Sequence, residues 1–266
     1  MRVFITGSTG FIGSEVVKEL LSAKHEVIGL ARSEKSVGKL RIVGASVING
    51  SLEDSDSLIR GAKQADAVIH CGFVHNFNDF NAAVQTDKQA IETIGNALVG
   101  TNKPFIVTSG VPSSVNGHIV TENDEEDTKH PRLSEQSALP FAEKDVRVSL
   151  MRPSRIVHGN GNFGFISMIA GIAKEKGVSA YVGDGSNNVH AVHVLDLAKL
   201  YLLALEKGEN GIKYQGVGDF AVPYIEIAEL IGKKLNVPVA SITAGEVMTH
   251  FGFLGQVVGA DNPASS

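Results

Sequence analysis

The chain has 266 residues, of which 43% are apolar and 20% charged, and its formal net charge is −5. This is globular composition, and the slight negative charge favours neither nucleic acid nor an anionic membrane as a partner. No apolar run approaches the roughly 20 residues that span a bilayer, and the N-terminal run is too short for a signal peptide. With Cys71 as its single cysteine, the chain forms no internal disulfide, so we expect a cytoplasmic protein.

Six short apolar runs predict β-strands along the first 151 residues. Between the first two lies "SEVVKELLSA", whose apolar residues recur at helical spacing. Strands that are apolar throughout and separated by helices indicate an α/β fold with a parallel sheet covered on both faces. The six predicted strands are Arg2–Thr6, Glu26–Ala31, Ala45–Gly50, Asp66–His70, Pro104–Ser109 and Val146–Met151.

The pattern changes after about residue 153. Gly/Asn-rich loops appear there, and two further helices are predicted, over Leu195–Leu205 and Ile225–Leu235. Pro140, in "SALPFAEK", falls inside a helical stretch and is expected to end or kink that helix.

The opening "MRVFITGSTGFIG" places Gly7, Gly10 and Gly13 three residues apart, between a predicted strand and a predicted helix. The first glycine permits a sharp turn, the second lets the backbone approach a pyrophosphate, and the third allows close packing of helix on strand. The N-terminus of the helix then offers oriented N–H donors to phosphate. The segment therefore predicts a dinucleotide-binding turn, although its G-x-x-G-x-x-G spacing differs from G-x-G-x-x-G.

"TGSTGFIG" followed by "HEVIGLAR" resembles the extended short-chain dehydrogenase/reductase family of NAD(P)-dependent epimerases, dehydratases and reductases. The resemblance continues, in the family's order, through "ADAVIHCGF", "FIVTSG", "VSLMRPSRIVHGNG" and "GDGSNNVHAVHVLDLAKLYLLAL". It implies a Rossmann-type doubly wound parallel sheet with a smaller, partly C-terminal substrate-binding region, in a monomer or homodimer acting on a small molecule. The NADP-binding core is expected over 1–153, completed by about 190–216, and the substrate-binding region over about 154–189 and 217–266.

The end of the second strand favours NADP over NAD. NAD-binding members usually carry an acidic residue there, whereas this chain has Ala31, followed by Arg32 and Ser33. A carboxylate would repel the extra phosphate of NADP, while a guanidinium can bind that phosphate with two parallel hydrogen bonds.

The resemblance places further cofactor contacts along the carboxyl edge of the sheet. The complete predicted set comprises Gly7, Ser8, Thr9, Gly10, Phe11, Ile12, Gly13, Arg32, Ser33, Ser51, Leu52, Cys71, Gly72, Phe73, Thr108 and Pro153.

The catalytic residues that the family commonly uses are not found at the expected places. None of the four tyrosines has a lysine four residues on, and Gly110 occupies the position of the family's serine. By the family's spacing, Asp127 and Pro131 lie near the positions of the tyrosine and the lysine. The chain thus resembles the atypical subgroup that lacks the Tyr-x-x-x-Lys pair.

Other side chains are candidates for moving a proton. Ser109 and Ser113 offer hydroxyls after the fifth strand, and His75 follows the fourth strand. Imidazole is suited to proton transfer at neutral pH. Weaker candidates are Thr108, Ser114, Lys129 and His130. The histidines His158, His190 and His193 lack the spacing of zinc ligands, so no metal site is predicted.

Three functions remain open on this reading. The first is an NADP-dependent oxidoreductase on a small carbonyl-type substrate with a non-standard proton donor. The second is a non-catalytic NADP(H)-binding protein with a redox-sensing or regulatory role. The third is a nucleotide-sugar epimerase or dehydratase, which is disfavoured because such reactions depend most on the missing tyrosine.

Overall fold

The computed structural model describes residues 1–75, 79–114, 118–125, 132–161 and 164–265. It divides the chain into two compact units. Unit 1 comprises residues 1–110, 126–152 and 194–216, and unit 2 comprises residues 111–125, 153–193 and 217–266. The predicted core, 1–153 with about 190–216, includes residues 111–125 and 190–193, which the structure places in unit 2.

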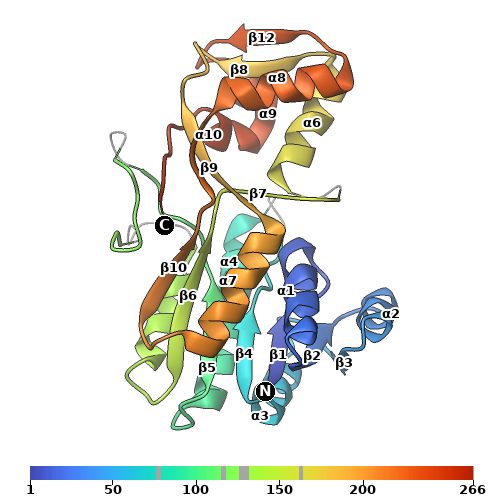
Figure 1. Cartoon of the computed structure of the whole chain (residues 1–266), viewed down its shortest axis with the longest axis vertical. Helices are drawn as coiled ribbons and strands as arrows, with labels where there is room; N and C mark the ends of the chain where they lie inside the picture. The colour runs from blue at the N-terminus through green and yellow to red at the C-terminus, as the bar shows by residue number, and fades with distance from the viewer. Residues whose placement is uncertain (76–78, 115–117, 126–131, 162–163, 266) are drawn as a thin grey trace. The chain divides into compact units, whose positions relative to one another are not determined.

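Unit 1 is built on a seven-stranded sheet of order β10-β6-β5-β4-β1-β2-β3 (Figure 1). The pairs from β6 to β3 are all parallel, and β1 lies between β2 and β4, with Val3 opposite Val27 on one side and Ala67 on the other. The six predicted strands are all present, with ends that shift by up to two residues. The observed strands are β1 Arg2–Thr6, β2 Glu26–Ala31, β3 Ser46–Asn49, β4 Ala67–His70, β5 Pro104–Thr108, β6 Arg147–Pro153 and β10 Ile212–Gly216.

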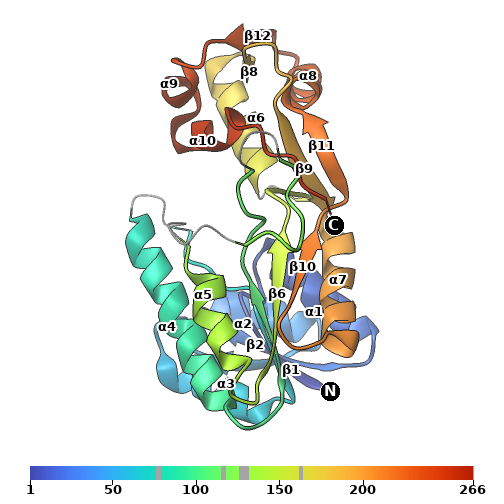
Figure 2. The same cartoon turned by 90° about the vertical axis from the view of Figure 1, so that its left-hand side faces the viewer.

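Helices cover both faces of this sheet. On one face α1 packs against α7, and on the other α4 packs against both α3 and α5 (Figures 1 and 2). This arrangement is the predicted Rossmann-type doubly wound fold. The helices of unit 1 are α1 Phe11–Ser22, α2 Glu34–Ile42, α3 Ser55–Gln64, α4 Phe80–Leu98, α5 Ser134–Ala138 and α7 Val194–Lys207, with a 3-10 turn at Leu139–Phe141.

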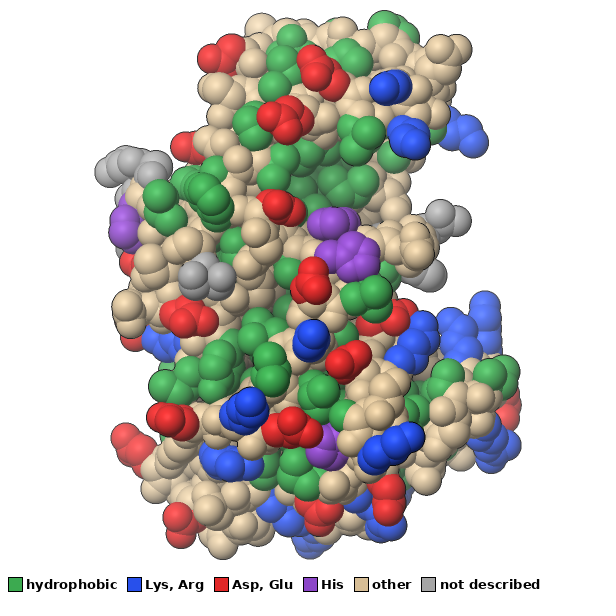
Figure 3. Space-filling model, viewed as in Figure 1, with side chains coloured by type: hydrophobic (Ala, Val, Ile, Leu, Met, Phe, Trp, Pro, Cys, Tyr) green, Lys and Arg blue, Asp and Glu red, His purple; other side chains and the backbone are tan. Residues whose placement is uncertain are grey.

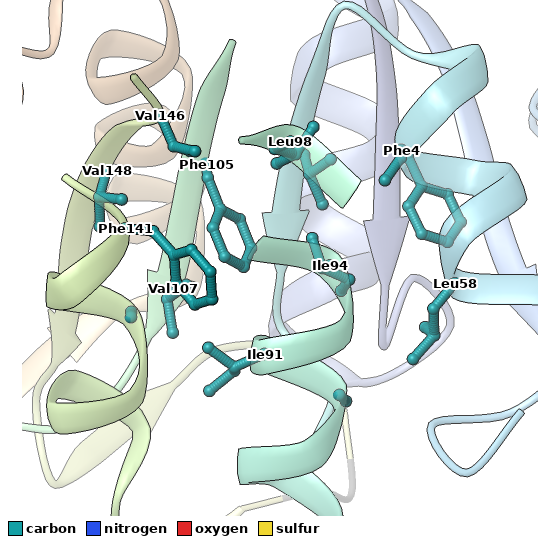
Figure 4. Close-up of a cluster of buried hydrophobic side chains, with 14 of the residues drawn as sticks. Phe4, Leu58, Ile91, Ile94, Leu98, Phe105, Val107, Phe141, Val146 and Val148 are labelled. Atoms are coloured by element: carbon teal, nitrogen blue, oxygen red, sulfur yellow. The ribbon is translucent and has the colours of Figure 1, made fainter. Parts of the chain in front are cut away.

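The main core of unit 1 fills the space between the sheet and the α3–α4–α5 layer. Phe4 and Phe105 point from the strands toward Leu58 and Ile91 on the helices, and Phe141 closes the layer beside α4 (Figure 4). Phe141 reaches this position because α5 ends at Ala138, before Pro140, as the sequence predicts. The chain then turns inward through the 3-10 segment.

Unit 2 has a separate apolar cluster and two small sheets, one of order β11-β9-β7 and one of β12-β8. The C-terminal segment is hydrogen-bonded into this unit, because the amide of Asn262 donates to Asn188 and that of Ser265 donates to Val120. The elements are β7 Ile156–His158, α6 Phe165–Lys176, β8 Ser179–Val182, β9 Asn188–His193, β11 Asp219–Pro223, α8 Tyr224–Leu235, β12 Val239–Ile242, α9 Val247–Phe251, a 3-10 turn at Gly252–Leu254 and α10 Gly255–Val258. Of the helices described in either unit, none has the length and apolarity needed to cross a membrane.

Candidate nucleotide-binding site

The turn between β1 and α1 has a backbone that admits no side chain at two of its glycines. Gly7 has φ +66°, and a Cβ built on it would lie 2.7 Å from the backbone of Cys71 and Gly72. A Cβ on Gly13 would lie 2.2 Å from the carbonyl oxygen of Gly7. Both distances are far inside van der Waals contact, so the turn keeps α1 close against β1 and β4 only with glycine at these positions.

The N-terminus of α1 carries no side-chain cap. Gly10 occupies the N-cap position of α1, whereas Asp54 and Asp79 cap α3 and α4 by accepting hydrogen bonds from backbone amides of the first turn. The first N–H groups of a helix have no intrahelical partner, and they carry the positive end of its dipole. The start of α1 therefore offers donors suited to phosphate oxygens.

The side chains of the turn hold it in place. Ser8 is buried and donates from Oγ to the carbonyl of Leu30 in β2 at 3.1 Å, while the hydroxyl of Thr9 lies 3.4 Å from that of Ser36 in α2. Ser8 and Thr9 are both predicted cofactor contacts. Their side chains contact other residues of the protein, so their backbone groups are the ones that can bind a ligand.

The end of β2 has the features on which the cofactor prediction rests. Ala31 is 3% exposed, and the next residue, Arg32, is exposed and forms no ion pair with any residue the structure describes. Ser33 caps α2 by accepting from the amide of Ser36. Lys and Arg side chains gather around the edge of unit 1 that carries α2 (Figure 3).

The ends of β3 and β4 complete the edge beside the turn. The amide of Gly72 donates to the hydroxyl of Thr6 at 3.1 Å, and a Cβ on Gly72 would lie 2.9 Å from the side chain of Leu52. Ser51 accepts from the amide of Glu53 through its hydroxyl. The predicted contacts Ser51, Leu52, Cys71 and Gly72 thus come from adjacent strand ends.

A buried network of hydrogen-bonded polar groups lies next to the glycine turn. His70 lies between Thr6 Oγ1, at 2.9 Å, and Asp87 Oδ1, at 3.0 Å, and the other oxygen of Asp87 accepts from Ser134. Burial would raise the pKa of Asp87, but hydrogen bonding and charge from His70, with Arg132 and Ser134, hold it below its usual value. This hydrogen-bonded network was not predicted from the sequence. The feature that could have indicated it is a charged residue, Asp87, at a core position of α4.

Arg132 joins the ends of β4 and β5. Its guanidinium donates to the carbonyls of Thr108 and Ser109 at 2.9 Å each, and it lies 4.6 Å from the ring centre of Phe73. The ring of Phe73 also meets that of His75 edge-on, with centres 5.6 Å apart. Burial and the charge of Arg132 lower the pKa of His75, so this imidazole is neutral at pH 7.

Ser109, a predicted catalytic residue, lies in a buried ionic network. Its hydroxyl donates to Glu135 at 2.7 Å, and Glu135 receives two further bonds of 2.7 Å from Arg152, which is fully buried. The bidentate pair satisfies both charges where water is excluded. The network ties α5 to the ends of β5 and β6.

Thr108 meets a tyrosine that the sequence analysis did not assign to the site. Its hydroxyl lies 2.6 Å from that of Tyr201, on α7, and 3.6 Å from the sulfur of Cys71. Burial raises the pKa of the Cys71 thiol to about 11 and moves the pKa of Tyr201 well above its usual range. Both groups are therefore protonated at neutral pH, and Tyr201 is fully buried.

Phe11 and Ile12 begin α1 in unit 1, and the other remaining predicted residues lie in unit 2 or outside the described residues. Pro153 ends β6, Ser113 lies 3.3 Å from the guanidinium of Arg155, and Ser114 donates to the carbonyl of His118. Lys129, His130, Asp127 and Pro131 are outside the described residues.

The histidines of unit 2 do not form a group of metal ligands in the described ranges. The rings of His158 and His193 meet edge-on with centres 5.3 Å apart, and His190 is buried against the backbone of Arg155. Within these ranges, no three or more His, Cys, Asp or Glu side chains are arranged to hold a metal ion.

A doubly wound sheet with an uncapped, glycine-lined turn at its first strand defines a dinucleotide-binding protein of the Rossmann class. Residues 3–217 match the model of the NAD dependent epimerase/dehydratase family, and the chain belongs to that family. Its members are NAD(P)-dependent oxidoreductases, epimerases or dehydratases of the short-chain type.

Three comparisons set the range of similarity. An uncharacterised protein of Schizosaccharomyces pombe is 47% identical over 270 residues, covering 100% of this chain and 91% of the relative. The sterol-4-alpha-carboxylate 3-dehydrogenase (decarboxylating) of Dictyostelium discoideum is 28% identical over 230 residues, or 79% of this chain and 69% of the relative. The crystal structure of a dTDP-glucose 4,6-dehydratase double mutant from Streptomyces venezuelae, with NAD bound, has a TM-score of 0.74 at 22% identity, covering 91% of this chain and 84% of that one.

Proposed function

We propose that the chain is an NADP(H)-dependent oxidoreductase that acts on a small carbonyl-type substrate with a non-standard proton donor. The observation that carries the choice of NADP is the end of β2, where a buried Ala31 stands in place of an acid. Arg32 follows it, exposed and without an ion pair to any described residue. The end of β2 therefore carries no carboxylate that would repel the 2′-phosphate of NADP. The guanidinium of Arg32 is available to bind that phosphate. The dehydrogenase name of the Dictyostelium relative supports redox chemistry.

The residues of unit 1 fit the nucleotide. Gly7 and Gly13 allow a close approach of the backbone that a Cβ would prevent, and the uncapped start of α1 offers N–H donors that would bind a pyrophosphate. Arg32 would bind the 2′-phosphate. When bound, the nicotinamide supplies the hydride. The protein would then have to orient the hydride acceptor and to transfer one proton.

Of the three predicted proton-transfer residues, His75 is the one whose chemistry suits the role best. The hydroxyl of Ser109 already donates to Glu135, and Ser113 lies in unit 2 beside Arg155. The side chain of His75 is accessible to solvent, and its partial burial together with the charge of Arg132 lowers its pKa, so that it is neutral at pH 7. A neutral imidazole can accept the proton of an alcohol directly, and in the reductive direction it can relay a proton from water.

The cofactor preference is tested by fluorescence titration with NADPH and with NADH. Arg32→Ala changes only an exposed side chain, and we expect it to weaken NADPH binding about 10- to 100-fold, the contribution of a charge-assisted bond, with little effect on NADH. Ala31→Asp/Arg32→Ala should move the preference toward NADH. Arg41→Ala, exposed on α2, the helix that begins just after Arg32, is the matched control. Failure of the wild type to bind either nucleotide would contradict the proposal.

Turnover is tested with aldehydes, ketones and imines as acceptors of hydride from NADPH. His75→Gln should leave NADPH binding unchanged and lower the rate about 10²- to 10⁴-fold, the usual contribution of a general acid or base. An unchanged rate would remove His75 from the mechanism.

A second function is favoured by a specific observation. The hydroxyl of Ser109, at the end of β5, is buried in the Glu135–Arg152 network rather than free for a substrate. An NADP(H)-binding protein that does not turn over, and signals redox state to a partner, needs no free hydroxyl there. Nucleotide binding without oxidation of NADPH by any acceptor, with partners recovered only when NADPH is present, would favour this function.

A further inference from the structure

Arg155, in unit 2 between β6 and β7, is a mostly enclosed cation that has no carboxylate partner among the residues that the structure describes. Within the described part of the chain its guanidinium makes one hydrogen bond, from Nη2 to Ser113 Oγ at 3.3 Å, and no ion pair. Arg152, three residues earlier, makes two bonds of 2.7 Å to Glu135. The two arginines lie three residues apart in the sequence and differ in this respect.

An enclosed charge without a counter-charge is costly for the folded protein. Water is partly removed from the guanidinium and no charge of opposite sign in the described residues replaces it, so burial lowers the pKa of Arg155. Proteins usually pair such a group. An anion arriving from solution would provide the missing partner and offset that cost.

Hydrogen bonds that run through the buried residues His190 and Asn262, here called the frame, hold Arg155 in place. Its backbone amide donates to His190 Nδ1 at 3.1 Å, His190 Nε2 lies 3.1 Å from the amide nitrogen of Asn262, and the amide oxygen of Asn262 accepts from the backbone of Ser114. His190 is 0% and Asn262 2% exposed. The frame connects Arg155 to the segment that carries Ser113, and so fixes the spacing of the two side chains.

The frame supplies no charge of its own. Burial and the nearby Arg155 lower the pKa of His190 to about 3, so its imidazole is neutral across the physiological range. The positive charge therefore rests on Arg155 alone.

The donors that remain define the ligand. A guanidinium presents five N–H groups in a planar fork that matches the oxygens of a carboxylate or phosphate. Ser113 accepts one bond from Arg155, which leaves its own O–H to donate, and its side chain is exposed. We propose that Arg155 and Ser113 form a site in unit 2 for the carboxylate or phosphate group of a small molecule. The proposal of this anion site does not depend on nucleotide binding. The further statement that the substrate of the enzyme is anionic rests on the proposed function.

Binding is tested by titrating inorganic phosphate, and separately acetate, into the protein by calorimetry, at constant ionic strength with chloride as the reference. Arg155→Gln should weaken binding at least tenfold. Arg155→Lys should fall between wild type and Arg155→Gln because it keeps a charge without the fork, and Ser113→Ala should lose about threefold to tenfold, one hydrogen bond. Lys234→Gln, exposed on α8 of the same unit, is the control.

The melting temperature without added anion gives an independent readout. Removing an enclosed charge that has no ion pair among the described residues should leave Arg155→Gln as stable as the wild type or more stable, while its stabilisation by phosphate or acetate is lost. A structural arginine would show the opposite: a lower melting temperature and unchanged anion binding.

The outcomes separate this site from the proposed nucleotide site. Phosphate also suits the start of α1, so titrations are repeated with NADPH present, and only the difference between wild type and Arg155→Gln counts. Equal anion binding by these two proteins overturns the proposal. A difference that persists when NADPH neither binds nor turns over supports the anion site while contradicting the proposed function. A response to phosphate alone or acetate alone identifies which anion the site takes.

Discussion

At the scale of single residues, His190 links protonation to folding. Its pKa is lowered to about 3 from the usual 6.5, first by burial and then by Arg155. Between these values the unfolded chain binds a proton at this site and the folded chain does not. Stability therefore decreases as the pH falls below about 6.5, by up to about 1.4 kcal/mol per pH unit for one proton.

The variant His190→Gln isolates this effect, because glutamine does not titrate but can still accept a bond from the amide of Arg155. Urea unfolding at several pH values between 4.5 and 7 should give a shallower slope for the variant than for the wild type. His75 and His250, whose pKa values are also lowered, contribute to both slopes and cancel in the comparison. Parallel slopes would show that His190 titrates normally in the folded protein.

The sequence also shows where prediction at this scale stops. Gly7 and Gly13 were predictable, because the turn needs them for steric reasons and their spacing is visible in the chain. The partners of Arg132 and Ser109 were not. Thr108 meets Tyr201 across 93 positions of sequence, and nothing in the local pattern of either residue encodes that contact.

At the scale of elements, the buried pair Glu135–Arg152 holds the short helix α5. Five residues are too few for a helix that is stable by itself, so its position depends on what it touches. Glu135 is 2% exposed and accepts from both Arg152 and Ser109.

Glu135→Ala should therefore lower the free energy of unfolding by about 3–5 kcal/mol, since it removes the carboxylate that is paired with the buried guanidinium of Arg152. Glu143→Ala, exposed just after the 3-10 turn, is the control and should change stability little. Denaturant unfolding of both variants measures the difference. A similar small change in both would mean that the pair contributes no net stability.

Elements whose signal is local were predicted best. β1 and β2 have the expected bounds, and α7 and α8 contain the expected ranges, because apolar runs and helical spacing are readable within a few turns. The break at Pro140 was also local. The small sheets of unit 2 were not predicted, since β7 is three residues long and its pairing with β9 joins segments about 35 residues apart.

At the scale of the whole molecule, the chain crosses between the two units several times, yet each unit has its own apolar cluster. All the residues that we propose for the glycine turn and the 2′-phosphate belong to unit 1. The assignment of nucleotide binding to that unit predicts that damage to the core of unit 2 leaves this binding intact.

Ile231→Ala tests this assignment. Ile231 is 5% exposed in the cluster of unit 2, and its truncation should cost about 2–5 kcal/mol of stability. The Kd for NADPH, measured well below the melting temperature, should stay within about twofold of the wild type. Leu58→Ala, in the cluster of unit 1, is the matched truncation there. A large loss of affinity in the Ile231 variant would show that unit 2 contributes directly to the nucleotide site.

The single thiol of the chain has a practical consequence for spectroscopy. With a pKa of about 11, only about one Cys71 in a thousand is thiolate at pH 8, and the thiolate is the form that reacts with maleimides. Cysteines introduced at exposed positions, one in each unit, can therefore be labelled with a dye pair while the native cysteine is retained. Energy transfer between the dyes would then report the separation of the units as nucleotide and anion are added.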